Sequence, residues 1–197
     1  MVEARTLAEA YAYLELSVPP GEAEVDYDRY STLERRADGY VLRFDGPYQG
    51  EWFTAEVSLP PDALAPGPDR PLSYGDGPSR LLDAGQWYAL EQAYAGMAEV
   101  GTGSPVPEDY YAVADAWQRA RAAVEEIEKL LPPEAAEVPE ECFWSQQGRR
   151  VRAAAPDAFR RVRLASAKER YARELAELTR TGPPVQAAPP ARPGAPG

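Results

Sequence analysis

The chain of 197 residues is predicted to form one α+β domain, with an N-terminal helix, a three- to four-stranded antiparallel meander and a C-terminal cluster of about four helices. Residues 27–59 alternate apolar and polar side chains between turn sequences, whereas residues 81–180 repeat apolar side chains at helical spacing. The domain is expected to span residues 1–180, with a helix and meander at 1–59, a Pro/Gly-rich crossover at 60–80 and helices at 81–180. Residues 181–197 are expected to form a disordered Pro/Ala/Gly tail.

The first helix is predicted by its start and stop signals. Thr6 and Glu9 have the spacing of a capping box, in which a hydroxyl and a carboxylate satisfy free N–H groups at a helix start. Pro19-Pro20-Gly21 ends the segment. Between these signals one apolar face is formed by Leu7, Ala10, Tyr11 and Leu14.

The meander is predicted by turn sequences that separate three alternating segments. Residues 30–35 lead into Asp38-Gly39, residues 40–44 lead into Asp45-Gly46-Pro47, and residues 51–59 form the last strand. In that strand, one face carries Phe53, Ala55, Val57 and Leu59, and the other carries Trp52, Thr54, Glu56 and Ser58. We therefore expect a sheet with one face in water and the other face packed on the C-terminal group of helices.

Three apolar stripes predict the helices of the second half. The first consists of Trp87, Leu90, Tyr94 and Met97. The second, in a long helix that begins near Pro105-Val-Pro107, consists of Val113, Trp117, Ala120, Val124, Ile127 and Leu131. The third, after Pro156-Asp157, consists of Leu164, Ala167, Tyr171, Leu175 and Leu178. Glu125, Glu126 and Glu128 are expected on the solvated face of the long helix.

Charge is distributed unevenly along the chain, whose net charge is −11. Residues 1–147 hold 10 Lys and Arg against 28 Asp and Glu, a net charge of −18, whereas residues 148–180 hold 10 against 4, a net charge of +6. The acidic part should repel nucleic acid and attract basic proteins. No signal peptide or membrane span is indicated and Cys142 is the single cysteine, so a cytoplasmic location is expected.

The composition excludes several kinds of catalytic site. The chain has no histidine, which removes Ser-His and Cys-His catalysis and the commonest zinc ligand. Cys142 has acidic neighbours that should raise its pKa, which favours a packing role. A carboxylate-based hydrolase remains an alternative, because it needs only two acids with separated pKa values in one pocket. We expect no metal or cofactor, and no enzyme activity.

Two clusters of charge are candidate binding sites. The first combines acidic side chains with aromatic side chains of the kind that anchor interfaces, and consists of Glu22, Glu24, Asp26, Tyr27, Asp28 and Tyr30. The second is a basic patch of Arg149, Arg150, Arg152, Arg160, Arg161 and Arg163. This patch would bind phosphate or an acidic partner, or would neutralise the acidic part of the same chain.

Three stretches carry a resemblance to known proteins: ARTLAEAYAYLEL at 4–16, PSRLLDAGQW at 78–87, and VPEECFWSQQGRRV with PDAFRRVRLASAKERY across 138–171. They resemble a set of small uncharacterised actinobacterial proteins that usually carry two Cys-x-x-Cys pairs, as a zinc ribbon would. The corresponding places here read Ser17-Val-Pro-Pro-Gly21 and Gly46-Pro-Tyr-Gln-Gly50, without the thiolates. The resemblance therefore implies a degenerate zinc ribbon and supports the architecture, but it assigns no activity.

Two functional hypotheses follow from these patterns. The first is an acidic, non-enzymatic protein-binding module, most specifically an immunity or antitoxin-type protein that neutralises a basic toxin. The second is a structural or accessory subunit of a larger bacterial assembly, with the crossover 60–80 and the basic patch making permanent contacts.

Overall fold

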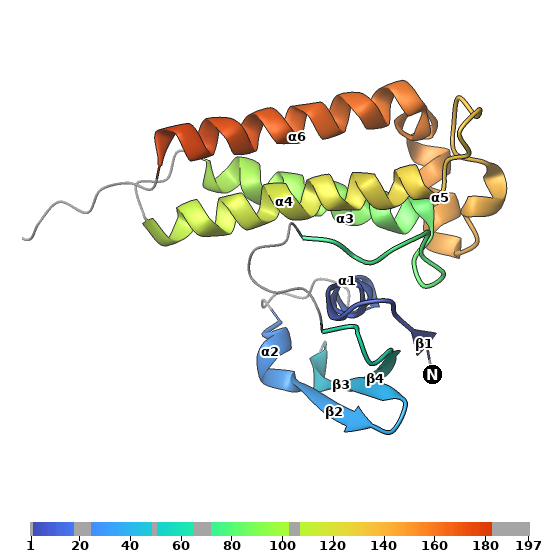
Figure 1. The fold of residues 1–197 in the computed structure, drawn as a ribbon, viewed down its shortest axis with the longest axis vertical. Helices are drawn as coiled ribbons and strands as arrows, with labels where there is room; N and C mark the ends of the chain where they lie inside the picture. The colour runs from blue at the N-terminus through green and yellow to red at the C-terminus, as the bar shows by residue number, and fades with distance from the viewer. Residues whose placement is uncertain (1, 18–24, 49–50, 65–71, 103–106, 183–197) are drawn as a thin grey trace, which may run out of the picture.

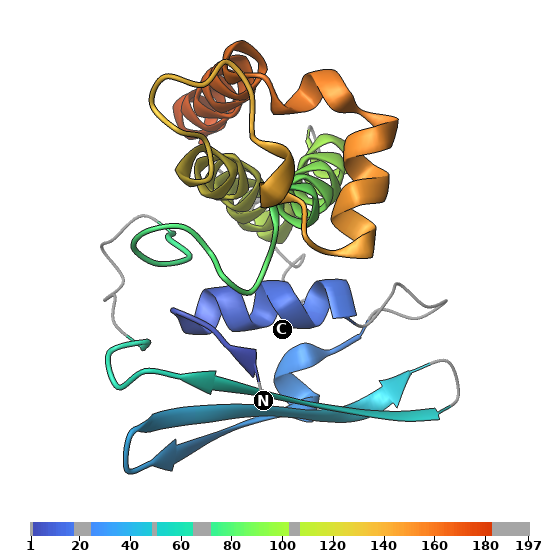
Figure 2. The same ribbon diagram turned by 90° about the vertical axis from the view of Figure 1, so that its right-hand side faces the viewer.

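The computed structural model describes residues 2–17, 25–48, 51–64, 72–102 and 107–182. It has a mixed α and β fold of stacked layers, with a sheet on one side, helix α1 (Leu7–Ser17) in the middle and a group of longer helices on the other side (Figures 1 and 2). The expected tail, apart from Thr181 and Gly182, lies outside the described residues, as does much of the crossover.

The sheet has the strand order β1-β4-β3-β2. The three expected strands are β2 (Ser31–Arg36), β3 (Gly39–Tyr48) and β4 (Glu51–Leu59), and they pair antiparallel as a meander. A purely antiparallel sheet is wrong, however, because β1 (Val2–Glu3) pairs parallel with β4, Val2 opposite Val57. Strand β3 also continues to Tyr48 instead of ending at Asp45, since each residue to Tyr48 pairs with β4.

The turn between β2 and β3 shows why a glycine stands at position 39. Arg36 pairs with Gly39, so the turn residues are Ala37 and Asp38, one residue before the expected position. Gly39 has a φ of +150°, and a Cβ there would lie 2.1 Å from the carbonyl oxygen of Leu59. Only glycine therefore fits this start of β3.

One face of the sheet is apolar, as the alternation predicts, but it packs on α1 and not on the expected C-terminal helices, because α1 lies between the two layers (Figure 2). Leu42, Phe44, Val57 and Leu59 are buried together with Leu14 of α1 in one core cluster. Short helix α2 (Tyr27–Tyr30) covers the end of this face and was not predicted. Its single turn offers no apolar period to recognise.

The helical layer contains the larger core cluster. Helices α3 (Ala84–Gly101), α4 (Pro107–Lys129) and α6 (Arg161–Thr181) run alongside one another, with α5 (Gln146–Ala154) across one end (Figure 1). All six residues of the stripe predicted in α4 are buried, but Met97 of α3 is 63% exposed and Ala98 is buried instead. The last helix begins at Arg161 because residues 156–159 form a 3-10 turn, η2 (Pro156–Phe159).

Helices α3 and α5 meet at a junction built from two glycines and a buried aspartate. Asp83 is fully buried; it accepts hydrogen bonds from the backbone N–H of Gln86 at 2.9 Å and of Ser145 at 2.7 Å. A Cβ on Gly85 would lie 2.5 Å from the Cα of Gly148. The backbones of the two helices therefore approach more closely than any side chain would allow.

Candidate functional site

The described part of the predicted acidic cluster lies where α2 meets the sheet. Asp26 begins α2, because its Oδ1 accepts a hydrogen bond from the backbone N–H of Arg29 at 3.0 Å. Tyr27 and Tyr30 lie against Phe44, with ring centroids 5.7 and 6.4 Å apart. Asp26 and Asp28 are exposed. The structure thus brings four of the six predicted residues together, and the other two, Glu22 and Glu24, lie outside the described residues.

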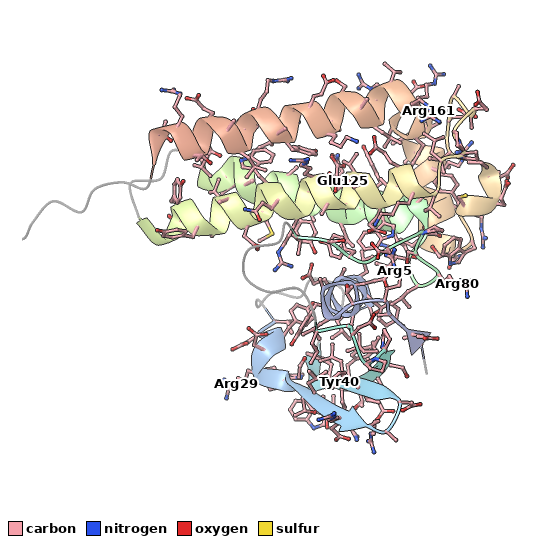
Figure 3. All side chains as sticks on the ribbon, viewed as in Figure 1. Arg5, Arg29, Tyr40, Arg80, Glu125 and Arg161 are labelled. Atoms are coloured by element: carbon pink, nitrogen blue, oxygen red, sulfur yellow. The ribbon has the colours of Figure 1, made fainter. Side chains whose placement is uncertain are left out.

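An exposed tryptophan adjoins this cluster. The indole of Trp52 is 68% exposed and meets the ring of Tyr30 edge to face at 6.2 Å. The guanidinium of Arg29 lies 5.4 Å from the centroid of the Tyr30 ring, and its side chain points away from the fold (Figure 3). We call Arg29, Tyr30 and Trp52 the aromatic patch. Its residue types are those that dominate interface hot spots.

Sequence reasoning placed Trp52 on the wet face of β4 but did not select it as a candidate. The signal was available, because a tryptophan on the polar side of an alternating strand has no core to enter. Tyr27 and Tyr30, which were selected as anchors, are both half-buried against the sheet. Trp52 therefore supplies most of the exposed aromatic surface of the site.

A cavity of about 570 Å³ is lined in part by α2, the helix that also carries Arg29 and Tyr30 of the aromatic patch, and we call it the acidic pocket. It is lined from α1, α2 and α4 by Tyr11, Glu15, Asp26, Tyr27, Asp28 and Arg119, with three apolar neighbours. Arg119 is the one cation in this lining. Its Nε lies 2.6 Å from Asp115 and its Nη1 lies 3.7 Å from Glu15, so its charge is already neutralised. The pocket is left with a negative charge.

Burial governs the ionisation of the groups in the acidic pocket. It raises the pKa of Glu15, against the opposing effects of a 2.5 Å hydrogen bond from the Tyr94 hydroxyl and of the Arg119 charge. It also raises the pKa of Tyr27 to about 12, and the nearby Glu15 carboxylate adds to this shift. Tyr27 therefore stays neutral near pH 7 and offers a hydroxyl beside the carboxylates.

The Glu15→Gln variant is expected to lose part of the pH dependence of stability. Because the folded-state pKa of Glu15 is raised, its contribution is complete below the ordinary glutamate pKa and is lost as pH rises through the raised value. In urea unfolding, the wild type should therefore lose this contribution as pH rises above the ordinary glutamate pKa, and the variant should lack this decline. Glu134→Gln, at an exposed position, is the control and should match the wild type. If the free energy of unfolding depends on pH equally in all three proteins, the raised pKa does not belong to Glu15.

A second group of charges is buried between α1 and α4, and we call it the ionic clamp. It consists of Arg5, Glu9, Glu126 and Lys129, and both carboxylate side chains are only 1% exposed. Nη2 of Arg5 lies 2.7 Å from Glu9 and 2.7 Å from Glu126. The Lys129 ammonium donates to Glu126 and, at 2.6 Å, to the carbonyl oxygen of Gly75. The clamp thus joins the sheet side of the molecule, the crossover and the helical layer.

Two sequence expectations are changed by the ionic clamp. Glu126 is not solvated: it is only 1% exposed, and its carboxylate is held by Arg5 and Lys129. Thr6 caps α1 as expected, with its Oγ1 3.1 Å from the backbone nitrogen of Glu9, but the Glu9 carboxylate binds Arg5 instead of completing the capping box at Thr6.

The ionic clamp borders a cavity of about 980 Å³ that Glu9 and Arg5 line together with Asp62, Asp76, Arg80 and Glu125. A carboxylate-based hydrolase would need an acid that is free to exchange a proton with substrate. All four carboxylate oxygens of Glu9 and Glu126 already accept hydrogen bonds from Arg5 or Lys129. This pair therefore fits a structural role better than an acid–base role.

The predicted basic patch is divided among separate structural contacts. Arg161, where α6 begins, donates to the carbonyl oxygens of Pro132 and Pro133 at 2.6 and 2.9 Å, beyond the end of α4 (Figure 3). The remaining contacts hold loops: Arg149 binds the carbonyl oxygen of Trp144, Arg152 binds that of Val138 and lies over Phe143, and Arg160 pairs with Asp157. Arg150 and Arg163 form no ion pair with a described residue.

Cys142 is half-buried, and its Sγ lies 3.5 Å from the carbonyl oxygen of Leu130. Burial raises the pKa of this thiol, and Glu141 and Asp83 add to the shift as the acidic neighbours predict.

Within the described residues, no three Cys, Asp or Glu side chains lie close enough to share a metal ion. No helix among those residues combines the length and apolarity that crossing a bilayer requires. Comparison with protein-family models, with curated proteins and with solved structures found no match.

Proposed function

We propose that this protein is a non-enzymatic, acidic protein-binding module that recognises a basic protein partner through the aromatic patch and the acidic pocket. The observation that carries the proposal is the exposed Trp52, which contacts Tyr30 at the end of α2, the short helix whose Asp26 and Asp28 line the acidic pocket. Large aromatic side chains supply contact energy at interfaces, and a surrounding field of one sign speeds the approach of an oppositely charged partner. An immunity or antitoxin-type protein that covers the basic cleft of a toxin has these properties.

The acidic pocket gives the proposed interface a place for a basic side chain. A lysine or arginine entering it would meet Glu15, Asp26 and Asp28, with the hydroxyls of Tyr11 and Tyr27 in the same lining. Charge-assisted hydrogen bonds of this type are among the stronger polar contacts in proteins. Glu22 and Glu24 stand four and two positions before Asp26 in the sequence and would add two negative charges.

Two variants test the proposal in a pull-down from native lysate at low and at high salt, followed by mass spectrometry. Trp52→Ala should reduce recovery of a salt-sensitive basic partner by about tenfold or more, because it removes the aromatic anchor. The second variant removes four negative charges and keeps the cap of α2, and should make recovery insensitive to salt. It combines Glu22→Gln, Glu24→Gln, Asp26→Asn and Asp28→Asn.

A matched control removes the same charge from other exposed positions. It combines Glu134→Gln, Glu140→Gln, Glu141→Gln and Glu169→Gln. The proposal requires this control to bind like the wild type. It fails if the control and the acidic-cluster variant lose the partner equally, or if Trp52→Ala retains full recovery.

The alternative, an accessory subunit of a larger assembly, is favoured by a separate apolar surface. Met97 and Val100 of α3 are 63% and 89% exposed, and Tyr111 of α4 is 65% exposed. If the protein is such a subunit, the isolated chain is expected to self-associate. A stable monomer in light scattering would count against it.

A further inference from the structure

A groove between α3 and α6 has a donor-rich lining that the proposed function does not use. It encloses about 280 Å³, with Val124 of α4 also in its lining. Helix α6 contributes Arg163, Ser166, Arg170 and Arg173, and α3 contributes Tyr88, Glu91 and Gln92. We call it the arginine groove. Arg170 and Arg173 did not belong to the basic patch predicted from sequence.

Two of the three guanidinium groups have no carboxylate partner. Arg170 pairs with Glu99 of α3, but neither Arg163 nor Arg173 forms an ion pair with any described residue. A guanidinium presents planar donors that match the oxygens of phosphate and carboxylate groups. The arginine groove therefore holds two positive charges without a fixed counter-charge, in a chain whose net charge is −11.

The one acid in the groove is already occupied by internal partners. Glu91 is 3% exposed; its Oε1 accepts a hydrogen bond from the Tyr171 hydroxyl, and its Oε2 accepts one from the Gln92 amide at 2.5 Å. Burial raises the pKa of Glu91, against the opposing effects of the hydrogen bonds from Tyr171 and Gln92. The hydrogen-bonding capacity left for a ligand in this lining is therefore mostly that of donors.

The spacing of the arginines indicates an extended anion. Arg163 and Arg173 are ten residues apart on one helix, which corresponds to about 15 Å along its axis, and Arg170 lies between them. Both line the same cavity, so a ligand with two linked anionic groups can meet Arg163 with one group and Arg173 with the other, which an ion with a single group such as orthophosphate cannot do. We propose that the arginine groove binds a small molecule with two linked phosphate groups, held by Arg163 at one end and Arg173 at the other.

The test is calorimetric titration of the full chain with pyrophosphate at low ionic strength, where surface charge interactions are least screened. Saturable binding is expected. The double variant Arg163→Gln/Arg173→Gln should weaken it by about tenfold or more, since it removes two charge-assisted contacts. Both side chains are exposed, so the variant should fold, and circular dichroism will check this.

Arg150→Gln/Arg180→Gln is the matched control, because it also removes two positive charges, from exposed arginines that do not line the groove. It should bind pyrophosphate like the wild type. Equal weakening in the control and the double variant would show attraction by overall charge and would overturn the proposal. A titration with no saturable binding signal would also overturn the proposal. So would citrate binding as tightly as pyrophosphate, because the groove would then be a site for carboxylates. These results do not depend on the protein partner proposed above.

Discussion

Arg5→Met is expected to lower the free energy of unfolding by about 3 to 5 kcal/mol, because removing one member of a buried charge network leaves the others uncompensated. Without the guanidinium, the Glu9 carboxylate keeps only the backbone N–H of residue 5, and Glu126 keeps only Lys129. Methionine retains most of the apolar stem, so the loss reports on charge more than on volume. Urea unfolding followed by circular dichroism measures the effect.

Arg121→Met is the control for this prediction. Arg121 pairs with Glu125 at 3.2 Å on a part of α4 where both side chains are more than one-third exposed. Such pairs contribute only about 0 to 1 kcal/mol, so the control should unfold nearly like the wild type. If Arg5→Met costs no more than Arg121→Met, the ionic clamp does not stabilise the contact between α1 and α4.

Gly85→Ala is expected to destabilise the protein by about 2 to 3 kcal/mol, because the added methyl group has no space. It would lie 2.5 Å from both the Cα and the carbonyl oxygen of Gly148, which are backbone atoms that cannot move without shifting α5. That shift would also strain the hydrogen bond from Ser145 to Asp83. Thermal and urea unfolding should both show the loss.

Gly96→Ala, in the same helix, is the matched control with the opposite expectation. A Cβ at Gly96 meets nothing within 4 Å. Since alanine is favoured over glycine inside a helix by about 1 kcal/mol, this variant should be more stable than the wild type. Equal effects of the two substitutions would mean that the close approach of α3 and α5 does not persist in solution.

The elements that sequence predicted well have strong local patterns. The stripe from Val113 to Leu131 and the alternation in β4 each recur within a few residues, so periodicity is sufficient to orient them. Strand β1 consists of two residues and pairs with a segment more than fifty positions later, which leaves no local signal. Helix α5 was missed because its nine residues include three arginines and two glutamines, and Val151 is their one large apolar residue.

The candidate site could be predicted only in part for a similar reason. The density of acids and tyrosines between positions 22 and 30 is visible in sequence, and the structure places Asp26, Tyr27, Asp28 and Tyr30 together. The contributions of Glu15 and Arg119 depend on how α1 and α4 meet, which no local pattern encodes. Charged side chains are rarely buried, so sequence analysis expects them in solvent. The burial of Glu126 beside Arg5 therefore could not be predicted from the sequence of α4 alone.

The pairing of Arg5 with Glu126 spans 121 positions of the chain, and β1 pairs with a part of β4 more than fifty positions later. Contacts between segments so far apart close large loops, which slows their formation relative to local helix and hairpin contacts. The meander and the antiparallel pair of α3 and α4 can therefore form early, as separate units. We therefore expect residues 2–9 to dock last and to join the two units, and refolding should show a late kinetic step in which the N-terminal segment becomes protected from hydrogen exchange.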